Sequence, residues 1–201
     1  MRIVIERGHS PYDPGAIGPT GLTEFEVVRA VAQRMGAMGY EVKGRDRKLS
    51  TLLWQLRWNK PDVVVSLHCN APSKTVHRCD VYLWREESDS IILQQSTALA
   101  TLIAEKAQGK FAEAGAIRWF PILRNNKYGE IEKFTPGIVR GTAKVAAVVV
   151  EMGFLSDKHT EAAMRTESWR DRAALAIHEG IEAWVKANAE LGVSPLAGGA
   201  A

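Results

Sequence analysis

Four acidic and imidazole side chains in this sequence are of the types that bind a catalytic metal ion and move protons. They are His9, Glu24, His68 and Glu151. Two imidazoles and one carboxylate, with a coordination position left open, suit a catalytic zinc ion, and a further carboxylate can accept a proton from water. The set predicts a metal-dependent hydrolase.

Each of these side chains lies where a predicted strand ends or a predicted helix begins. Glu24 lies at the start of the first helix. β-Branched and apolar runs predict the strands, and residues 2–6, 63–67 and 146–150 lead into His9, His68 and Glu151, respectively. Because ligands gather beyond the carboxyl ends of strands in α/β sheets, we expect the four side chains to share one rim of the sheet.

The first helix has a clear start. Thr23 followed three residues later by Glu26 forms a capping box, and Gly39 ends the helical pattern. The role of Glu24 there could be limited to a favourable interaction with the helix dipole, which contributes about 0.3–1 kcal/mol to stability. Glu26 is the neighbouring candidate ligand, but it fits the capping box better. The predicted apolar face consists of Val27, Val28, Val31, Ala32, Met35 and Met38.

Helical and strand patterns alternate along the rest of the chain. Ser50 is predicted to cap a short helix, and His159 is placed in a polar turn. This alternation predicts an α/β fold: a single domain with a mainly parallel or mixed twisted sheet covered by helices on both faces. We assign residues 1–190 to this domain and 191–201 to a flexible tail. Further strands are predicted at 40–43, 80–84 and 138–139 and further helices at 90–114 and 169–188, and 117–136 is irregular.

Charge and hydropathy exclude some classes of partner. The 26 basic and 23 acidic side chains leave a net charge of only +3, without a dense basic tract, so nucleic acid is not expected as a partner. No segment approaches the roughly 20 apolar residues of a membrane span, and the apolar run after Met1 is too short for a signal peptide. We therefore expect a chain that stays in the cytoplasm in which it is made.

The two cysteines and the remaining histidines are expected to take no part in catalysis. Cys69 and Cys79 are predicted to be free, buried thiols. Strand alternation points Cys69 to the face opposite His68, which makes it a poor metal ligand. No site role is expected for His77, His159 and His178.

Five short motifs occur in the order typical of one enzyme family. They are Gly8-His9, Asp13-Pro14-Gly15-Ala16, Glu24 ahead of Val27-Val28, Ser66-Leu67-His68-Cys69-Asn70-Ala71, and Glu151-Met152-Gly153-Phe154-Leu155-Ser156. Together they resemble the zinc-dependent N-acetylmuramoyl-L-alanine amidases of type 3, over nearly the whole chain. Glu6-Arg7 stands where that family usually has Asp-x, a departure that removes no ligand. Residues 52–62 are shorter than the family's segment and residues 117–136 do not align cleanly, which leaves substrate preference open.

The resemblance implies both the reaction and the site. It implies that His9, Glu24 and His68 bind one zinc ion, and that Glu151 is the general base and acid toward a zinc-activated water. Asn70 and Arg140 are expected to contact the substrate. The bond cleaved would be the amide between the lactyl group of N-acetylmuramic acid and L-alanine in bacterial peptidoglycan.

Several alternatives remain at this point. The chain could be another zinc hydrolase acting on peptidoglycan, a peptidase or a deacetylase, or a wall-binding module that has lost catalysis. We expect a phage endolysin catalytic domain, monomeric, present in the host cytoplasm before release to the cell wall. A bacterial cell-wall remodelling amidase is the alternative setting.

Overall fold

The fold is centred on a six-stranded mixed sheet. The computed structural model describes residues 1–44, 49–71, 79–83, 91–108, 110, 123–124 and 145–191. The strands are β1 (Ile3–Arg7), β2 (Glu41–Gly44), β3 (Val63–Asn70), β4 (Asp80–Leu83), β5 (Leu123–Arg124) and β6 (Ala146–Phe154), in the order β2-β1-β3-β6-β4-β5. The first four strands in this order are parallel, β4 is antiparallel to β6, and β5 is parallel to β4. The predicted mixed sheet is confirmed.

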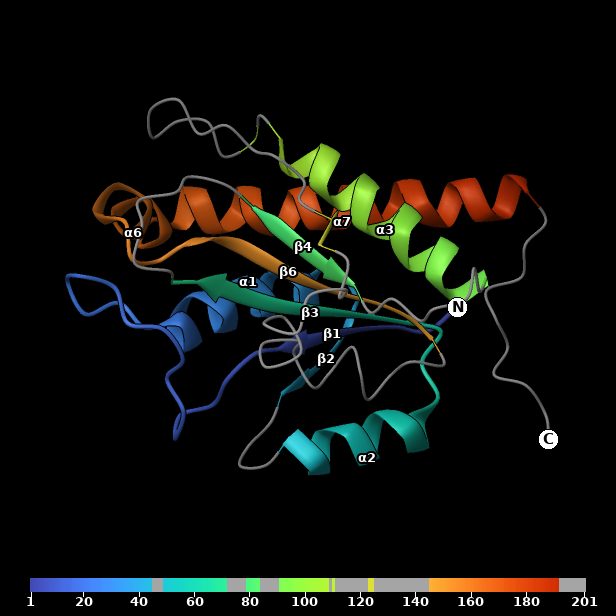
Figure 1. Cartoon of the computed structure of the whole chain (residues 1–201), viewed down its shortest axis with the longest axis horizontal. Coiled ribbons are helices and arrows are strands. Elements are labelled where there is room, and N and C mark those ends of the chain that lie inside the picture. The colour runs from blue at the N-terminus through green and yellow to red at the C-terminus, as the bar shows by residue number, and fades with distance from the viewer. Residues whose placement is uncertain are drawn as a thin grey trace.

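Helices cover both faces of this sheet. They are α1 (Glu24–Ala37), α2 (Leu49–Asn59), α3 (Ile91–Ala107), α6 (Lys158–Met164) and α7 (Glu167–Glu190). In Figure 1, α3 and α7 cross one side of the sheet and α2 lies on the other. The predicted α/β architecture with helices on both faces is therefore confirmed. None of the described helices is both long and apolar enough to cross a membrane.

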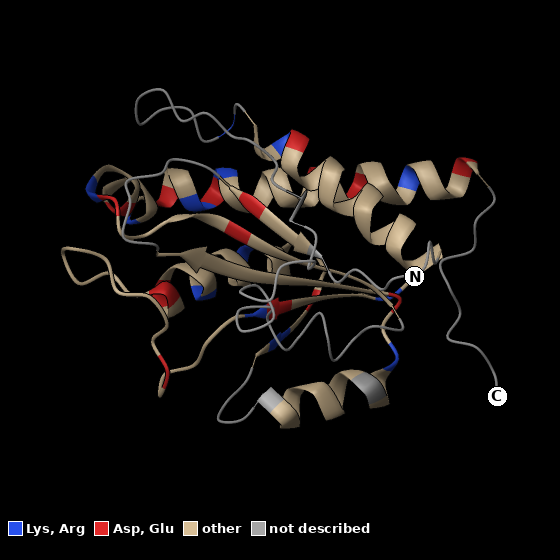
Figure 2. Ribbon diagram, in the orientation of Figure 1, with Lys and Arg blue, Asp and Glu red and all other residues tan. Residues whose placement is uncertain are grey.

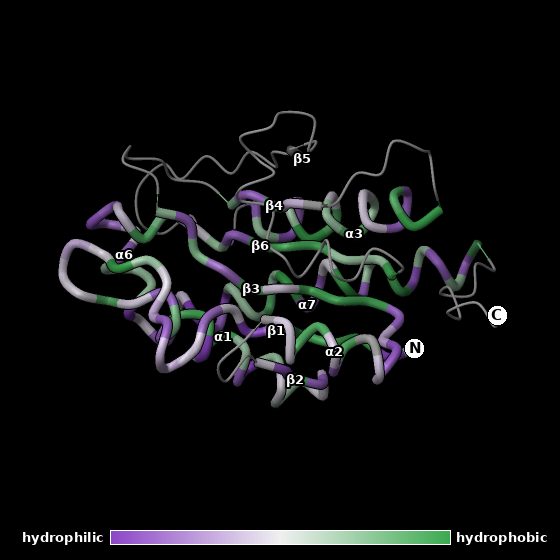
Figure 3. The backbone as a smooth tube through the Cα atoms, turned by 60° about the horizontal axis from the view of Figure 1, so that its bottom comes forward, coloured by the Kyte–Doolittle hydropathy of each residue, from purple (hydrophilic) through white to green (hydrophobic). Residues whose placement is uncertain are grey.

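Alternation along the strands divides the core into two layers. In β3, Val63, Val65 and Leu67 belong to the larger layer, which also contains buried side chains of α1, α3 and α7. Val64, between them, belongs to a smaller layer with Leu52 and Leu56 of α2. Because both faces of the central strands are buried, these strands are apolar along most of their length, as Figure 3 shows for β3 and β6.

The first helix begins as predicted. The Thr23 side chain accepts a hydrogen bond from the backbone N–H of Glu26, and the Glu26 carboxylate accepts one from the backbone N–H of Thr23 at 2.8 Å. The prediction for Met38 was wrong, because the helix ends at Ala37 and Met38 is 40% exposed. Gly39, with φ 98°, adopts the left-handed conformation that terminates the helix.

Several predicted boundaries were also wrong. Both β3 and β6 continue past the expected ends because their mutual pairing extends to Asn70 and Phe154. Ser50 lies inside α2, which begins at Leu49. The short helix α6 was not predicted; Asp157 caps it, so His159 is helical and not in a turn. Several predicted positions lie outside the described residues: the strand 138–139, Arg140, His77, Trp84, residues 111–114, most of 117–136 and the tail from 192.

Candidate metal centre

The first candidate ligand, His9, is positioned by a close contact between two backbone segments. After β1 ends at Arg7, the N–H of Gly8 donates to the carbonyl oxygen of Leu67 at 3.1 Å. A Cβ at Gly8 would lie 2.6 Å from Cε1 and Nε2 of His68, so only glycine allows this approach. His9 itself has φ 61°, a left-handed conformation that costs a non-glycine residue about 1–3 kcal/mol and is found mainly at functional sites.

The carboxylate of Glu24 lies between the two imidazoles. Its Oε1 is 2.8 Å from Nδ1 of His68, and its Oε2 is 3.1 Å from Nε2 of His9. Two backbone groups hold it in this orientation: the N–H of Cys69 donates to Oε1 and the N–H of Ala16 donates to Oε2, both at 2.9 Å. Although Glu24 is the first residue of α1, the residue is only 4% exposed and its side chain is turned into the protein. Its role therefore exceeds that of an acid that interacts with the helix dipole.

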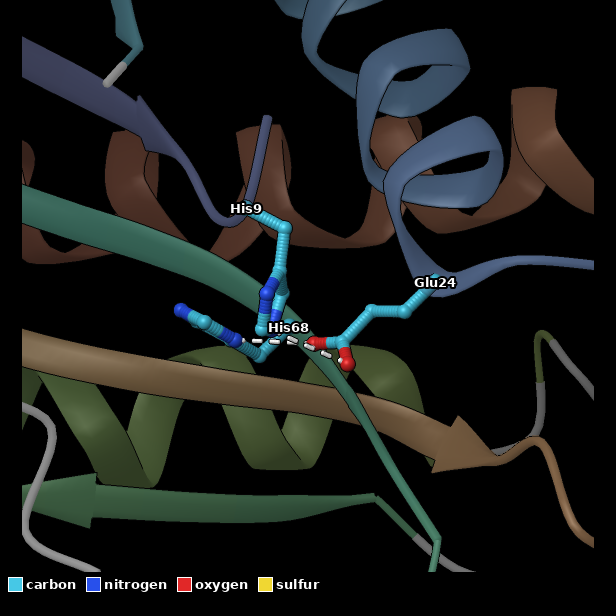
Figure 4. Close-up of side chains that lie close together, drawn as sticks. All are labelled: His9, Glu24 and His68. Carbon is cyan, nitrogen blue, oxygen red and sulfur yellow. Dashed lines mark hydrogen bonds and ion pairs between the residues drawn. The ribbon is translucent and has the colours of Figure 1, made fainter. Parts of the chain in front are cut away.

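The three side chains form one compact donor set. Figure 4 shows His9 from the loop after β1, His68 from β3 and Glu24 from the start of α1 converging on one point. Their candidate ligand atoms all lie within 4.8 Å of one another, and the two rings meet edge to face with centroids 5.0 Å apart. Zinc ligands at about 2.0–2.2 Å from the ion must lie a little over 3 Å apart, so the residues present fit a zinc ion.

The charges around this donor set favour a cation. Burial opposes ionisation of His68, but hydrogen bonding to Glu24 and the negative charges of Glu151 and Glu6 raise its pKa to about 9. Burial alone would raise the pKa of the Glu24 carboxyl, but the two histidines outweigh it and the pKa falls well below its usual range. The same field that attracts a proton to His68 would attract a divalent metal ion, with release of that proton.

Glu151 lies on the strand next to His68 and directly opposite it. The two are register partners in β3 and β6, and Asp80 of β4 faces Glu151 on its other side. The acidic positions of β4 and β6 are the neighbouring red bands in Figure 2. Burial, together with the carboxylates of Glu24 and Asp80, raises the pKa of Glu151 to about 7 against the opposing effect of the histidines. Among the described residues, its buried Oε2 has no hydrogen-bond partner.

Asn70 lies at the far end of β3, beyond a register shift in the β3–β6 pairing that separates it from His68. Its side-chain oxygen accepts a hydrogen bond from the N–H of Ala71, and its carbonyl oxygen accepts one from Leu155. Such bulges occur often beside active sites. A substrate contact by Asn70 stays a prediction, as does one by Arg140, which lies outside the described residues.

Sequence reasoning missed two carboxylates that lie behind the imidazoles. Oδ2 of Asp13 is 3.2 Å from Nδ1 of His9, and Oε2 of Glu6 is 4.0 Å from Nε2 of His68. Glu6 is 2% exposed and accepts a hydrogen bond from the hydroxyl of Ser66. A signal for them existed, because Glu6, Ser66 and His68 occupy alternate positions of two paired strands and so share one face. Carboxylates placed behind ligand histidines orient the rings of many metal sites.

The remaining predicted positions are placed as follows. Cys69 and Cys79 are free and buried, as predicted, and Cys69 belongs to the larger core layer on the face opposite His68. His178 lies on α7, where its Nδ1 is 2.9 Å from the hydroxyl of Tyr40. Within the described part of the chain, the only group of three or more potential ligands is the one formed by His9, Glu24 and His68.

Comparison with known proteins identifies the family of the chain. The family described as N-acetylmuramoyl-L-alanine amidase matches residues 3–183. The chain belongs to this family. A curated relative, the N-acetylmuramoyl-L-alanine amidase AmiC of Neisseria meningitidis serogroup B, is 25% identical over 222 residues, covering 91% of this chain and 52% of its own length. The chain thus spans about half the length of that amidase.

Solved structures of amidases share the fold. The N-acetylmuramoyl-L-alanine amidase AmiC2 of Nostoc punctiforme superposes with a TM-score of 0.70 at 20% identity, covering 92% of this chain and 97% of the other. The catalytic domain of an endolysin targeting Clostridia Difficile gives a TM-score of 0.60 at 18% identity, covering 91% and 97%. At these low identities, the similarity to the solved structures shows a shared fold and nothing more.

Proposed function

We propose that this protein is a zinc-dependent N-acetylmuramoyl-L-alanine amidase that binds one zinc ion per chain. Its substrate would be bacterial peptidoglycan, and the bond cleaved the amide between the lactyl group of N-acetylmuramic acid and L-alanine. The single observation behind the proposal is the His9, Glu24 and His68 donor set, with the buried Glu151 opposite His68 on the next strand. Membership of the amidase family supports the choice of substrate.

The three ligand side chains would hold the ion, and Glu151 would handle protons. A bound zinc ion would act as a Lewis acid that polarises the scissile carbonyl and lowers the pKa of water at the site. Glu151 is suited to accept a proton from water and to deliver it to the leaving amine, because burial brings the pKa of its carboxyl to about 7. Its Oε2, which lacks a hydrogen-bond partner among the described residues, is available for that proton.

Muropeptide analysis tests the proposal directly. Purified peptidoglycan is digested with the protein, with the protein treated with a chelator, and with the treated protein resupplied with zinc. Mass spectrometry should find glycan without stem peptide, together with peptides that begin at L-alanine, in the first and third digests only. New amino termini at other residues, or released acetate, would instead indicate a peptidase or a deacetylase. Intact muropeptides in all three would indicate a wall-binding module.

We further propose that the protein acts as a phage endolysin, as a monomer held in the host cytoplasm until it reaches the wall. The fold is compatible with this setting, because an endolysin catalytic domain shares it. Expression in bacterial cells should leave the culture intact until the inner membrane is permeabilised, after which turbidity should fall rapidly. If permeabilised cells remain intact while the protein cleaves purified peptidoglycan, a remodelling role in a bacterium becomes the better explanation.

A further inference from the structure

Another buried carboxylate, outside the candidate metal centre, binds the segment that leads into Glu24. Glu161 of α6 is completely buried. Its Oε1 accepts hydrogen bonds from the backbone N–H groups of Thr20 and Leu22, both at 3.0 Å, and its Oε2 lies 2.9 Å from the N–H of Thr20. A Cβ at Gly18 would lie 2.5 Å from this carboxyl group, so the backbone of the loop passes directly over it.

The loop held by Glu161 is a small hairpin that ends at the metal ligand. Residues 17 and 23 pair across it, and Gly18 donates to the carbonyl of Leu22 at 2.8 Å. At its base, Ala16 contacts Glu24 twice: its carbonyl accepts from the N–H of Glu24 at 2.8 Å, and its N–H donates to the Glu24 carboxylate. Displacement of the hairpin would therefore move the Glu24 side chain and one of its two backbone donors together.

The helix that carries Glu161 follows directly after β6, the strand that contains Glu151. The chain runs from Glu151 in β6 to Asp157, which caps α6, and Glu161 follows one turn later. Arg165, on the next turn, adds contacts from the solvent side: its guanidinium donates to the carbonyl of Thr20 at 3.0 Å and to the Thr20 hydroxyl at 2.9 Å. One short segment thus connects the proposed proton acceptor to the loop that positions a proposed ligand.

We propose that Glu161 is a positioning residue of the metal centre, which fixes the 17–23 hairpin and through it sets the place of the Glu24 carboxylate. This inference rests on the proposed zinc site. It predicts that replacing Glu161 weakens metal binding more than the accompanying loss of stability explains. Loss of a residue that orients a zinc ligand typically lowers metal affinity by about 10- to 100-fold.

The test compares four variants in the full chain. Glu161→Gln removes the charge but keeps the shape of the side chain. Arg165→Ala loosens the same hairpin, and it is not expected to cause misfolding because the Arg165 side chain is 44% exposed. Glu190→Gln, on the exposed end of α7, is the control for charge. Trp184→Phe is the control for stability, because Trp184 is a buried side chain between α7 and α3 that donates to the carbonyl of Gln95.

Three measurements are made on each variant: thermal unfolding, zinc affinity by competition with a chromophoric chelator, and hydrogen exchange of residues 16–24 in the metal-free protein. We expect Glu161→Gln to lower zinc affinity at least about tenfold and to speed exchange in this segment. Arg165→Ala should do the same to a smaller extent. Trp184→Phe should lower the unfolding midpoint without changing zinc affinity, and Glu190→Gln should change none of the three.

Three results would overturn the inference. Faster exchange in Glu161→Gln with unchanged zinc affinity would mean that the hairpin does not set the position of Glu24. An equal loss of zinc affinity in Trp184→Phe would mean that Glu161 affects zinc binding only through the stability of the fold. A parent protein that binds no zinc would refute the proposed function and this inference with it, whereas the first two outcomes leave the proposed function standing.

Discussion

Replacing Gly15 with alanine should damage the candidate metal centre far more than the fold. Gly15 has φ +69°, and a Cβ there would lie 2.5 Å from Oε2 of Glu24 and 2.7 Å from Cδ2 of His9. Ordinary contacts between non-bonded carbon atoms are about 3.5–4.0 Å, so one or both ligands must retreat by roughly 1 Å. Since metal–ligand distances tolerate only about 0.2 Å, a shift of this size should lower zinc affinity by at least about tenfold.

Gly39 offers a matched control for the backbone effect. It also has a left-handed φ, +98°, but a Cβ there would meet none of the described atoms within 4 Å. An L-residue in this conformation costs about 1–2 kcal/mol, so Gly15→Ala and Gly39→Ala should both lower the unfolding midpoint. Chelator competition and circular dichroism melts, run on both variants, separate the two effects. Equal zinc affinities in Gly15→Ala and Gly39→Ala would refute the reasoning.

Further predictions concern the proton acceptor, the thiols and an ion pair. Glu151→Gln should keep its zinc content but lose about 10²- to 10⁴-fold in the rate of peptidoglycan cleavage; full activity would exclude Glu151 as the base. Because burial raises the pKa of both thiols, Cys69 and Cys79 should react with a thiol reagent only on unfolding, and rapid labelling of the native protein would contradict their burial. Arg2 and a neighbouring lysine lower the pKa of Glu41 from 4.5 to about 2, so the stability that this carboxylate contributes is fully present above pH 4.5 and is lost as the pH falls toward 2. In Arg2→Ala, the midpoint of thermal unfolding should therefore change less between pH 4.5 and 2 than in the parent, and parallel curves would refute the effect of Arg2.

The sequence was sufficient for features that are encoded locally. The capping box at Thr23 and Glu26 predicted the start of α1, and apolar runs predicted β3 and β6. The prediction that the site side chains share one rim of the sheet followed from topology, because parallel strands place their carboxyl ends together. Glu24 could be told apart from a residue favouring the helix dipole only through the family resemblance, since its inward orientation depends on the N–H groups of Ala16 and Cys69.

The features that were missed depend on contacts between distant segments. The pairing of β3 with β6, not the hydropathy of either, sets how far both strands extend past the predicted ends. Helix α6 is only 7 residues long, too short for a helical repeat to stand out. Glu161 looks like an ordinary surface acid in the sequence, yet it is buried because its partners are backbone N–H groups 139 and 141 residues away.

The hydrogen bond from the backbone N–H of Cys69 to Glu24 has a consequence for which residues can replace Cys69. The main chain makes this bond, so it does not depend on which side chain stands there. Every substitution that the core tolerates should preserve it, and proline alone, which has no N–H, would abolish it. Natural variation at this position should therefore be wide for small apolar residues and should exclude proline, whereas His68, as a proposed zinc ligand, should tolerate no change.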